Sequence, residues 1–102
     1  MTVKIGGYTF GGWYSYISTL DEEPGIYAIG CEKDDKVKVI DIGETDNIQE
    51  RVKTHDRKDC WERECKDGTI KYAQYKTNID QEEREKIEKE IRDAVDPPCG
   101  KE

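Results

Sequence analysis

Apolar side chains are scarce in this chain, and their scarcity restricts it to a fold with a small core. Hydrophobic residues make up 33% of the 102 residues, whereas charged residues make up 40%. A composition of this kind taken alone leans towards disorder. Six Tyr, two Trp and four Cys supply further bulk. We therefore expect one folded domain, residues 1–102, with a thin core.

The charge and the N-terminal sequence argue against several classes of protein. No apolar run approaches the roughly 18 residues of a membrane-spanning helix, and MTVKIGGYTF lacks the pattern of a secretory signal. A cytoplasmic location without a membrane partner follows as the default, and there the four Cys are expected to be free thiols. The formal net charge of −7 repels nucleic acid in bulk.

Two apolar runs predict a β-hairpin. Residues 25–31 (GIYAIGC) form one run and residues 36–42 the other, with a polar turn between them. By simple alternation Asp41 shares the face of Val39, although a buried carboxylate is costly unless it is paired. Gly43 is expected to end the second strand.

The rest of the chain predicts two helices and a third strand. Asp46 and Asp80 each begin a helix, and Pro97 ends the second one. Residues 69–77 (TIKYAQYKT) are rich in β-forming side chains, and residues 6–23 are expected to cover the edge of the core. The fold class is therefore α+β, a small three-stranded, mainly antiparallel sheet flanked by helices in the order β-β-α-β-α.

Five polar side chains converge if the hairpin strands are adjacent and both helices pack on them. They are Tyr27, Asp41, Arg51, His55 and Glu88. An arginine can clamp a phosphate, a histidine and a tyrosine can move a proton, and a lone carboxylate suits a hydrated Mg²⁺. Together these residue types suit phosphodiester hydrolysis. Spacing alone leaves a solvated polar face as the other interpretation.

The order of these residues resembles that of the GIY-YIG endonuclease domain. The resemblance is carried by Gly25-Ile26-Tyr27, by Asp41-Ile42-Gly43, by Thr45, Asn47, Arg51 and His55, and by Glu88 with Pro97 nine residues later. It covers a core of about residues 24–98. It implies a metal-dependent DNA endonuclease using Mg²⁺ or Mn²⁺, of the kind found in DNA repair, acting on nicked, flapped or branched DNA rather than on a particular sequence.

The resemblance implies a catalytic role for four residues. Tyr27 would orient or deprotonate the attacking water, and Arg51 would neutralise charge on the scissile phosphate. His55 would assist proton transfer or help to position the water. Glu88 would be the sole protein ligand of the divalent cation.

Position 41 is where this chain differs from the family pattern, which has a tyrosine at the corresponding place. We expect the Asp41 carboxylate to pair with Arg51, or else to join Glu88 as a second metal ligand. Asp41→Tyr would raise cleavage in the first case and lower it in the second. The resemblance also implies that Gly43 allows close approach of backbone and substrate, and that Asn47 ties the helix start to the strand turn.

One segment leans basic and is the expected DNA contact. It contains Arg57, Lys58, Arg63 and Lys66. The Cys60 and Cys65 pair has a spacing unlike that of a zinc finger, which favours lone thiols over a zinc site. The alternative function is a catalytically impaired relative that binds nucleic acid or protein, which Asp41 and the net charge support. A third hypothesis, an acidic protein-interaction domain, rests on charge alone.

Overall fold

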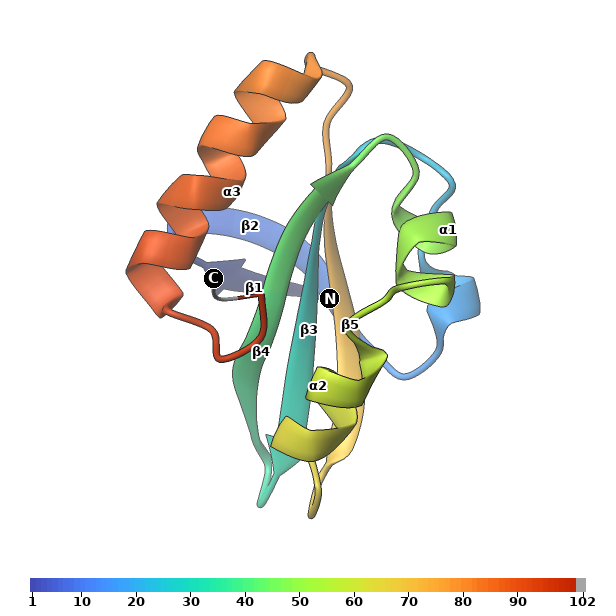
Figure 1. The fold of residues 1–102 in the computed structure, drawn as a ribbon, viewed down its shortest axis with the longest axis vertical. Helices are drawn as coiled ribbons and strands as arrows, with labels where there is room; N and C mark the ends of the chain where they lie inside the picture. Colours follow the sequence, from blue (N-terminus) through green and yellow to red (C-terminus); the bar gives the residue numbers. More distant parts are fainter. Residues whose placement is uncertain (101–102) are drawn as a thin grey trace.

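The structure of this chain, a computed structural model, describes residues 1–100. Two β-hairpins come first, followed by two short helices, a fifth strand and a long C-terminal helix (Figure 1). The elements are β1 (Thr2–Ile5), β2 (Tyr8–Tyr14), the 3-10 helix η1 (Ile17–Thr19), β3 (Gly25–Lys33), β4 (Lys36–Thr45), α1 (Ile48–Lys53), α2 (Lys58–Glu64), β5 (Thr69–Lys76) and α3 (Gln81–Val95).

All five strands join one antiparallel sheet in the order β1-β2-β5-β3-β4. The predicted α+β class is confirmed, but the predicted three-stranded sheet is wrong. The N-terminal segment, expected to be a cover, supplies the two additional strands. The glycines of that segment hide its strand character, because glycine is depleted in strands.

Helices cover the two faces of the sheet, with α3 on one face and α1 and α2 on the other (Figure 1). Each face carries its own apolar cluster. The cluster under α1 and α2 includes Tyr27, Ile29, Ile40, Ile48, Val52 and Trp61. The cluster under α3 includes Phe10, Ile26, Ala28, Ile42, Ala73 and Ile91. The thin apolar content is therefore divided between two small cores.

A bulge in the β3–β4 hairpin decides which way Asp41 faces. Ile29 pairs with Asp41 and Gly30 pairs with Val39, so Ile40 is the additional residue. Asp41 consequently shares the face of Ile29 under α1 and α2, whereas Val39 packs under α3. The prediction that Asp41 and Val39 share a face is wrong for this reason. The predicted end at Gly43 is also wrong, because β4 continues to Thr45.

The first helix is shorter than predicted, and a second one follows it. Asn47, not Asp46, caps α1 by accepting a hydrogen bond from the Glu50 backbone N–H at 3.1 Å. Because α1 ends at Lys53, His55 lies in the connection to α2 rather than on a helix face. The short helix α2 lies within a polar stretch for which no element was predicted.

The last helix and the C-terminal tail close the edge of the sheet. Asp80 caps α3 as predicted, accepting from the Glu83 backbone N–H at 2.9 Å. Beyond α3 the tail turns back, and the Cys99 backbone N–H donates to the Ile40 carbonyl at 2.9 Å. The tail thereby covers part of the open edge of β4. No helix in residues 1–100 is both long and apolar enough to span a bilayer.

Both ends of α2 are attached to other elements by disulfides. Cys65, just after α2, is bonded to Cys31 of β3, and Cys60 within α2 is bonded to Cys99 of the tail. The prediction of free thiols is wrong. These pairs lie 34 and 39 residues apart in the sequence, so only the tertiary fold brings them together.

Candidate functional site

Tyr27 occupies the middle of the sheet and points under α1 and α2. It is buried and pairs in register with Gly43 of β4. A Cβ atom at position 43 would meet the Tyr27 hydroxyl, since the two would lie only 2.1 Å apart. Gly43 therefore makes room for the Tyr27 ring, which is a more local role than the predicted approach of substrate.

His55 is hydrogen-bonded to the Tyr27 hydroxyl. The distance between Tyr27 Oη and His55 Nε2 is 2.5 Å. On the other side of the ring, His55 Nδ1 accepts the Arg57 backbone N–H at 3.0 Å. A neutral imidazole carries one proton, so this contact assigns the proton to Nε2, which donates to Tyr27.

Tyr27 Oη receives a second donor from α2's N-terminal side. Arg57 Nη2 donates to it at 3.3 Å. With two donors pointing at its oxygen, the Tyr27 hydroxyl must direct its own proton elsewhere. The geometry makes Tyr27 a hydrogen-bond donor towards any third group that reaches the site.

Burial perturbs the pKa values of both members of this pair. Desolvation is the largest cause that raises the pKa of Tyr27 to about 12; Asp41 and Glu88 raise it further, and Arg57 and Arg51 oppose the rise. Hydrogen bonds connect Tyr27 to His55 and, through Arg57, to Asp41. Arg92 joins Asp41 to Glu88, whereas Arg51 pairs with Asp56, the neighbour of His55. Desolvation also lowers the pKa of His55 to about 4, with Arg51 and Arg57 contributing.

The depressed pKa of His55 predicts a loss of stability in mild acid. The unfolded chain binds the proton below a pKa of 6.5, but the folded chain binds it only below about 4. The neutral ring's stabilisation is complete above pH 6.5 and declines as pH falls towards 4. Between pH 7 and pH 5 we expect the free energy of unfolding of the wild type to fall by about 2 kcal/mol more than that of His55→Gln.

Urea unfolding of both proteins at pH 7 and pH 5 measures this difference. Because the chain contains one histidine, an NMR titration of its ring gives the pKa of His55 directly. A midpoint near 6.5, or equal pH dependence in the two proteins, would contradict the assignment of a buried neutral ring.

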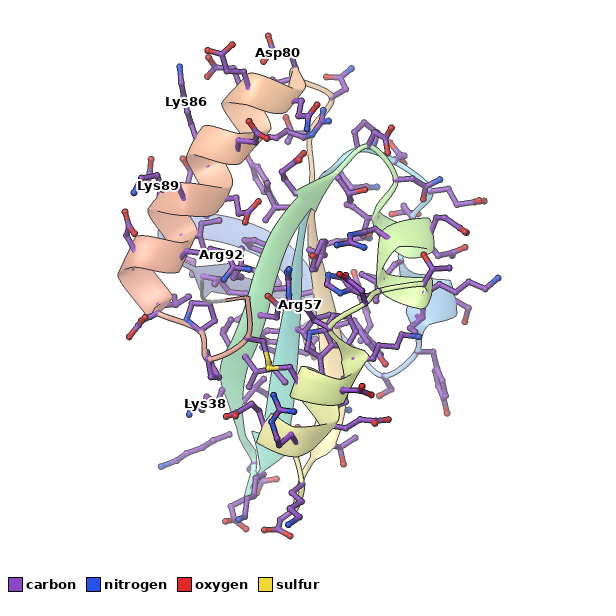
Figure 2. All side chains as sticks on the ribbon, viewed as in Figure 1. Lys38, Arg57, Asp80, Lys86, Lys89 and Arg92 are labelled. Atoms are coloured by element: carbon purple, nitrogen blue, oxygen red, sulfur yellow. A yellow bond between two sulfur atoms is a disulfide. The ribbon has the colours of Figure 1, made fainter. Side chains whose placement is uncertain are left out.

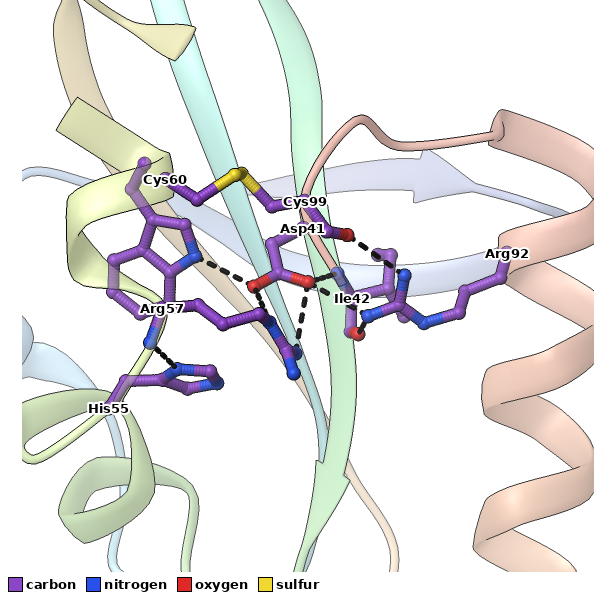
Figure 3. Close-up of a disulfide and its surroundings, with 8 residues drawn as sticks. Asp41, Ile42, His55, Arg57, Cys60, Arg92 and Cys99 are labelled. Atoms are coloured by element: carbon purple, nitrogen blue, oxygen red, sulfur yellow. Dashed lines mark hydrogen bonds and ion pairs between the residues drawn. A yellow bond between two sulfur atoms is a disulfide. The ribbon is translucent and has the colours of Figure 1, made fainter. Parts of the chain in front are cut away.

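Asp41 is the centre of the most highly connected polar cluster in the described chain. Its side chain is fully buried. Arg57 contacts both carboxylate oxygens at 2.9 and 3.1 Å, and Arg92 Nη2 donates to Oδ1 at 2.8 Å (Figure 3). Trp61 Nε1 donates to Oδ2 at 2.7 Å, and the Ile42 backbone N–H donates to Oδ1 at 2.9 Å.

The two arginines reach Asp41 from opposite sides of β4. Arg57 approaches from the start of α2, and Arg92 crosses the strand edge from α3 (Figures 2 and 3). Arg92 also donates to the carbonyls of Ile42 and Cys99, which binds the tail to the same cluster. The expected pairing of Asp41 with Arg51 is wrong, because the loop after His55 places Arg57 closer to the carboxylate.

The arginines keep the Asp41 carboxylate ionised despite its burial. Desolvation is the largest influence and acts to raise the pKa of Asp41. Hydrogen bonds from Arg57 and Trp61, with the charges of Arg57 and Arg92, outweigh it and lower the pKa below its usual range. Asp41 is therefore a stably charged structural group whose acceptor positions are occupied by protein donors.

Arg51 lies at the edge of a shallow polar pocket of about 230 Å³. The pocket is lined by Glu44, Thr45, Asp46, Arg51, Gln81 and Arg84. The Arg51 side chain is 37% exposed and pairs with the exposed Asp56 at 3.1 Å. An exposed ion pair is worth little in water, so an incoming phosphate can replace Asp56.

Glu88 lies on α3 with both carboxylate oxygens engaged. Oε1 accepts the Glu44 backbone N–H at 3.1 Å, and Oε2 accepts from Arg92 Nε at 3.0 Å. The side chain is 26% exposed, and each oxygen has a further lone pair. A single carboxylate can hold Mg²⁺ when waters complete the shell. Glu88 therefore fits a divalent cation only when waters supply most of the ligands. The cation would compete with Arg92 for the Glu88 carboxylate.

The predicted basic segment does not form a uniformly positive surface. Arg57 is committed to Asp41, and Lys58 Nζ donates to the Lys53 carbonyl. Arg63 and Lys66 are exposed. Three acidic residues, Asp59, Glu62 and Glu64, lie among the four basic ones, and Asp56 and Asp67 flank the segment. The segment 57–66 has a net charge of only +1, which leaves little electrostatic attraction for DNA.

Sequence reasoning missed the partners of Asp41. Trp61 and Arg92 donate to its carboxylate, yet neither was assigned to the site. Arg92 is four residues beyond Glu88, the spacing at which helical side chains meet. That spacing was the available signal for Arg92, whereas no pattern indicated Trp61.

Comparison with known proteins supplies no relative for this chain. No family model, no curated protein and no solved structure matches it. Within residues 1–100 no group of three or more His, Cys, Asp or Glu side chains is arranged to hold a metal ion. The function must therefore be inferred from the residues themselves.

Proposed function

We propose that this chain is a GIY-YIG-like endonuclease that hydrolyses phosphodiester bonds in DNA. The observation that carries the proposal is the shared hydrogen bonding of Tyr27 Oη by His55 and Arg57, at 2.5 and 3.3 Å. A buried phenol held by two donors has a fixed orientation and a proton to offer. Such a preorganised donor suits the binding of a reacting water or a phosphate oxygen.

Tyr27 acts in this scheme as an orienting donor. With a pKa of about 12, only about one molecule in 10⁵ carries a phenolate at neutral pH. Because His55 Nδ1 accepts from Arg57, Nε2 already carries the single proton of the neutral ring. His55 therefore cannot accept a proton from water at Nε2. The two residues therefore position the attacking water, and the proton of that water is released to solvent because neither residue can accept it.

Arg51 and Glu88 supply the remaining parts of the site. Arg51 exchanges Asp56 for the scissile phosphate and balances the charge that develops on it. Glu88 would hold a divalent cation through one oxygen, with waters completing the shell. When bound, Mg²⁺ or Mn²⁺ supplies Lewis-acid polarisation of the phosphate and lowers the pKa of bound water.

A nicked, flapped or branched DNA is the substrate we propose. The polar pocket at Arg51 is shallow, and the net charge of −7 opposes the approach of DNA, so we expect binding to be weak and steeply salt-dependent. These properties favour DNA ends and junctions, whose phosphates protrude, over the long contact needed to recognise a sequence. Action in DNA repair is the corresponding proposal for its biological role.

One observation favours a second function, a catalytically impaired relative that binds nucleic acid or protein. Arg92 pairs with Glu88 at 3.0 Å and so competes with a cation for its carboxylate. A stable Arg92–Glu88 pair would leave the fold and the arginines intact while preventing cation binding. The two functions differ in whether DNA is cut.

Cleavage of nicked and branched DNA across a Mn²⁺ and Mg²⁺ titration tests the proposal. Tyr27→Phe removes the hydroxyl and is expected to lower the rate by about 10²-fold or more, and Glu88→Gln is expected to abolish cation-dependent cleavage. Lys86→Gln removes a charge from an exposed position on α3 and should cleave like the wild type.

The outcomes separate the two functions. Tyr27→Phe or Glu88→Gln cutting at the wild-type rate would overturn the assigned site. Absence of cleavage by the wild type under every cation, combined with retained DNA binding, would favour the impaired relative.

A further inference from the structure

Arg57 connects the Asp41 cluster to the Tyr27–His55 pair. Its guanidinium contacts both oxygens of Asp41, and the same Nη2 atom donates to Tyr27 Oη. Its backbone N–H fixes the proton position on His55. One residue thus links a buried carboxylate to both groups that we assign to water positioning.

We propose that Asp41 is a positioning residue for Tyr27: it holds the Arg57 guanidinium so that Nη2 donates to Tyr27 Oη and the phenol proton is directed at the substrate. This inference rests on the proposed function for its catalytic meaning, but its geometry can be tested without DNA. Asp41 touches no reacting atom in this scheme and acts only through Arg57.

The geometry of the contact requires an arginine and a fixed carboxylate. A planar guanidinium held at two points has its remaining donors aimed in a set direction, which a lysine ammonium cannot reproduce. Asp41 is itself immobilised, because Trp61 donates to it on one side and Arg92 on the other. The Arg57 side chain is 30% exposed and would be mobile without that anchor.

Disulfides reinforce the same arrangement. Cys60 lies next to Trp61 in α2, and its bond to Cys99 holds α2 against the tail (Figure 3). Cys99 in turn accepts from Arg92 at 3.1 Å. At the position where the resemblance predicts a tyrosine, the chain therefore has Asp41 at the centre of a connected, fully hydrogen-bonded network. Such a network holds its members in one arrangement.

The pKa of His55 offers a readout of Arg57 that is independent of cleavage. The charged groups that influence it are Arg51, Arg57, Asp41 and Asp56. Arg57 lowers the pKa of His55, so Arg57→Gln should raise it above about 4. If Asp41 holds Arg57 in place, the same substitution in the Asp41→Asn background should shift the pKa by less than half as much.

The experiment is a double-mutant cycle read twice, by NMR titration of the single histidine and by kcat/KM on nicked DNA. We expect Asp41→Asn and Arg57→Gln each to lower kcat/KM by about tenfold or more, with the double variant no slower than the worse single one. Arg57→Lys should not restore activity. Lys86→Gln serves as the charge-removal control.

Each outcome bears on one proposal. Additive shifts in the pKa of His55, with Arg57→Gln equally effective in both backgrounds, would overturn the positioning role. Coupled shifts without cleavage by the wild type would support the positioning of Arg57 and count against the endonuclease. If Asp41→Asn does not fold, Trp61→Phe removes one donor to Asp41 and keeps an aromatic ring in the core, and the cycle is repeated with it under the same criteria.

Discussion

Reduction of the two disulfides is expected to unfold most of this protein at physiological temperature. They close loops of 34 and 39 residues, for which the chain-entropy model gives about 3–4 kcal/mol each. The total stability of a domain this size is about 5–15 kcal/mol, and the thin core places this chain towards the lower end. Thermal unfolding followed by circular dichroism, with and without a thiol reductant, measures the effect.

Paired serine variants separate the two bonds. The double variant Cys31→Ser/Cys65→Ser releases α2 from β3. The double variant Cys60→Ser/Cys99→Ser releases α2 from the tail, whose Cys99 carbonyl accepts from Arg92. We expect the second pair to raise the solvent exposure of Asp41 and to weaken the Tyr27–His55 contact. An unchanged melting temperature after complete reduction would contradict the stabilising role assigned to the two disulfides.

The cysteines illustrate what sequence reasoning cannot recover. Their spacing carries no pairing information until β3, α2 and the tail have been placed in space. The assumption of a reducing compartment then selected free thiols, although disulfides persist mainly in oxidising compartments. The cytoplasmic location remains a prediction from the N-terminal sequence, and the disulfides do not favour it.

The elements with strong periodicity could be predicted, and those with interrupted periodicity could not. The apolar run of β3, the β formers of β5 and the capped helix α3 all lie close to the predicted positions. The strand β2 contains Gly11 and Gly12, whose lack of side chains breaks the alternation. The helix α2 buries only Trp61, too little to give a helical stripe.

The direction in which Asp41 points was unpredictable for a related reason. A strand alternates strictly unless a bulge intervenes, and one additional residue moves every later side chain to the other face. The bulge at Ile40 turns Asp41 towards α2, where Arg57 and Trp61 meet it. The candidate site residues could be chosen from the sequence, but the partners of Asp41 depended on that single bulged residue.

Asp41→Tyr is expected to destabilise the fold strongly and not to activate it. The substitution restores the residue that the resemblance expects, yet it removes the shared acceptor of Arg57, Arg92 and Trp61. Breaking a buried, hydrogen-bonded ion pair from one side costs about 3–5 kcal/mol. A phenol also needs more volume than the buried carboxylate leaves, which adds strain.

Urea unfolding and a thermal melt measure this loss, with a fall in melting temperature on the order of 15–20 °C for a domain of this size. Asp93→Tyr is the matched control, because Asp93 carries the same side chain at a position that is 70% exposed, where it forms a surface ion pair with Lys89 at 3.2 Å. Its stability should stay within about 0.5 kcal/mol of the wild type.

The comparison decides between two roles for the buried carboxylate. If Asp41 only occupies space that a tyrosine could fill, Asp41→Tyr will match Asp93→Tyr in stability and cleave DNA faster than the wild type. If Asp41 is the anchor for Arg57 and Arg92, Asp41→Tyr will unfold far more readily than Asp93→Tyr, and any folded fraction will cleave more slowly. We expect the second result, because Arg57, Arg92 and Trp61 would all lose the buried carboxylate that accepts their hydrogen bonds.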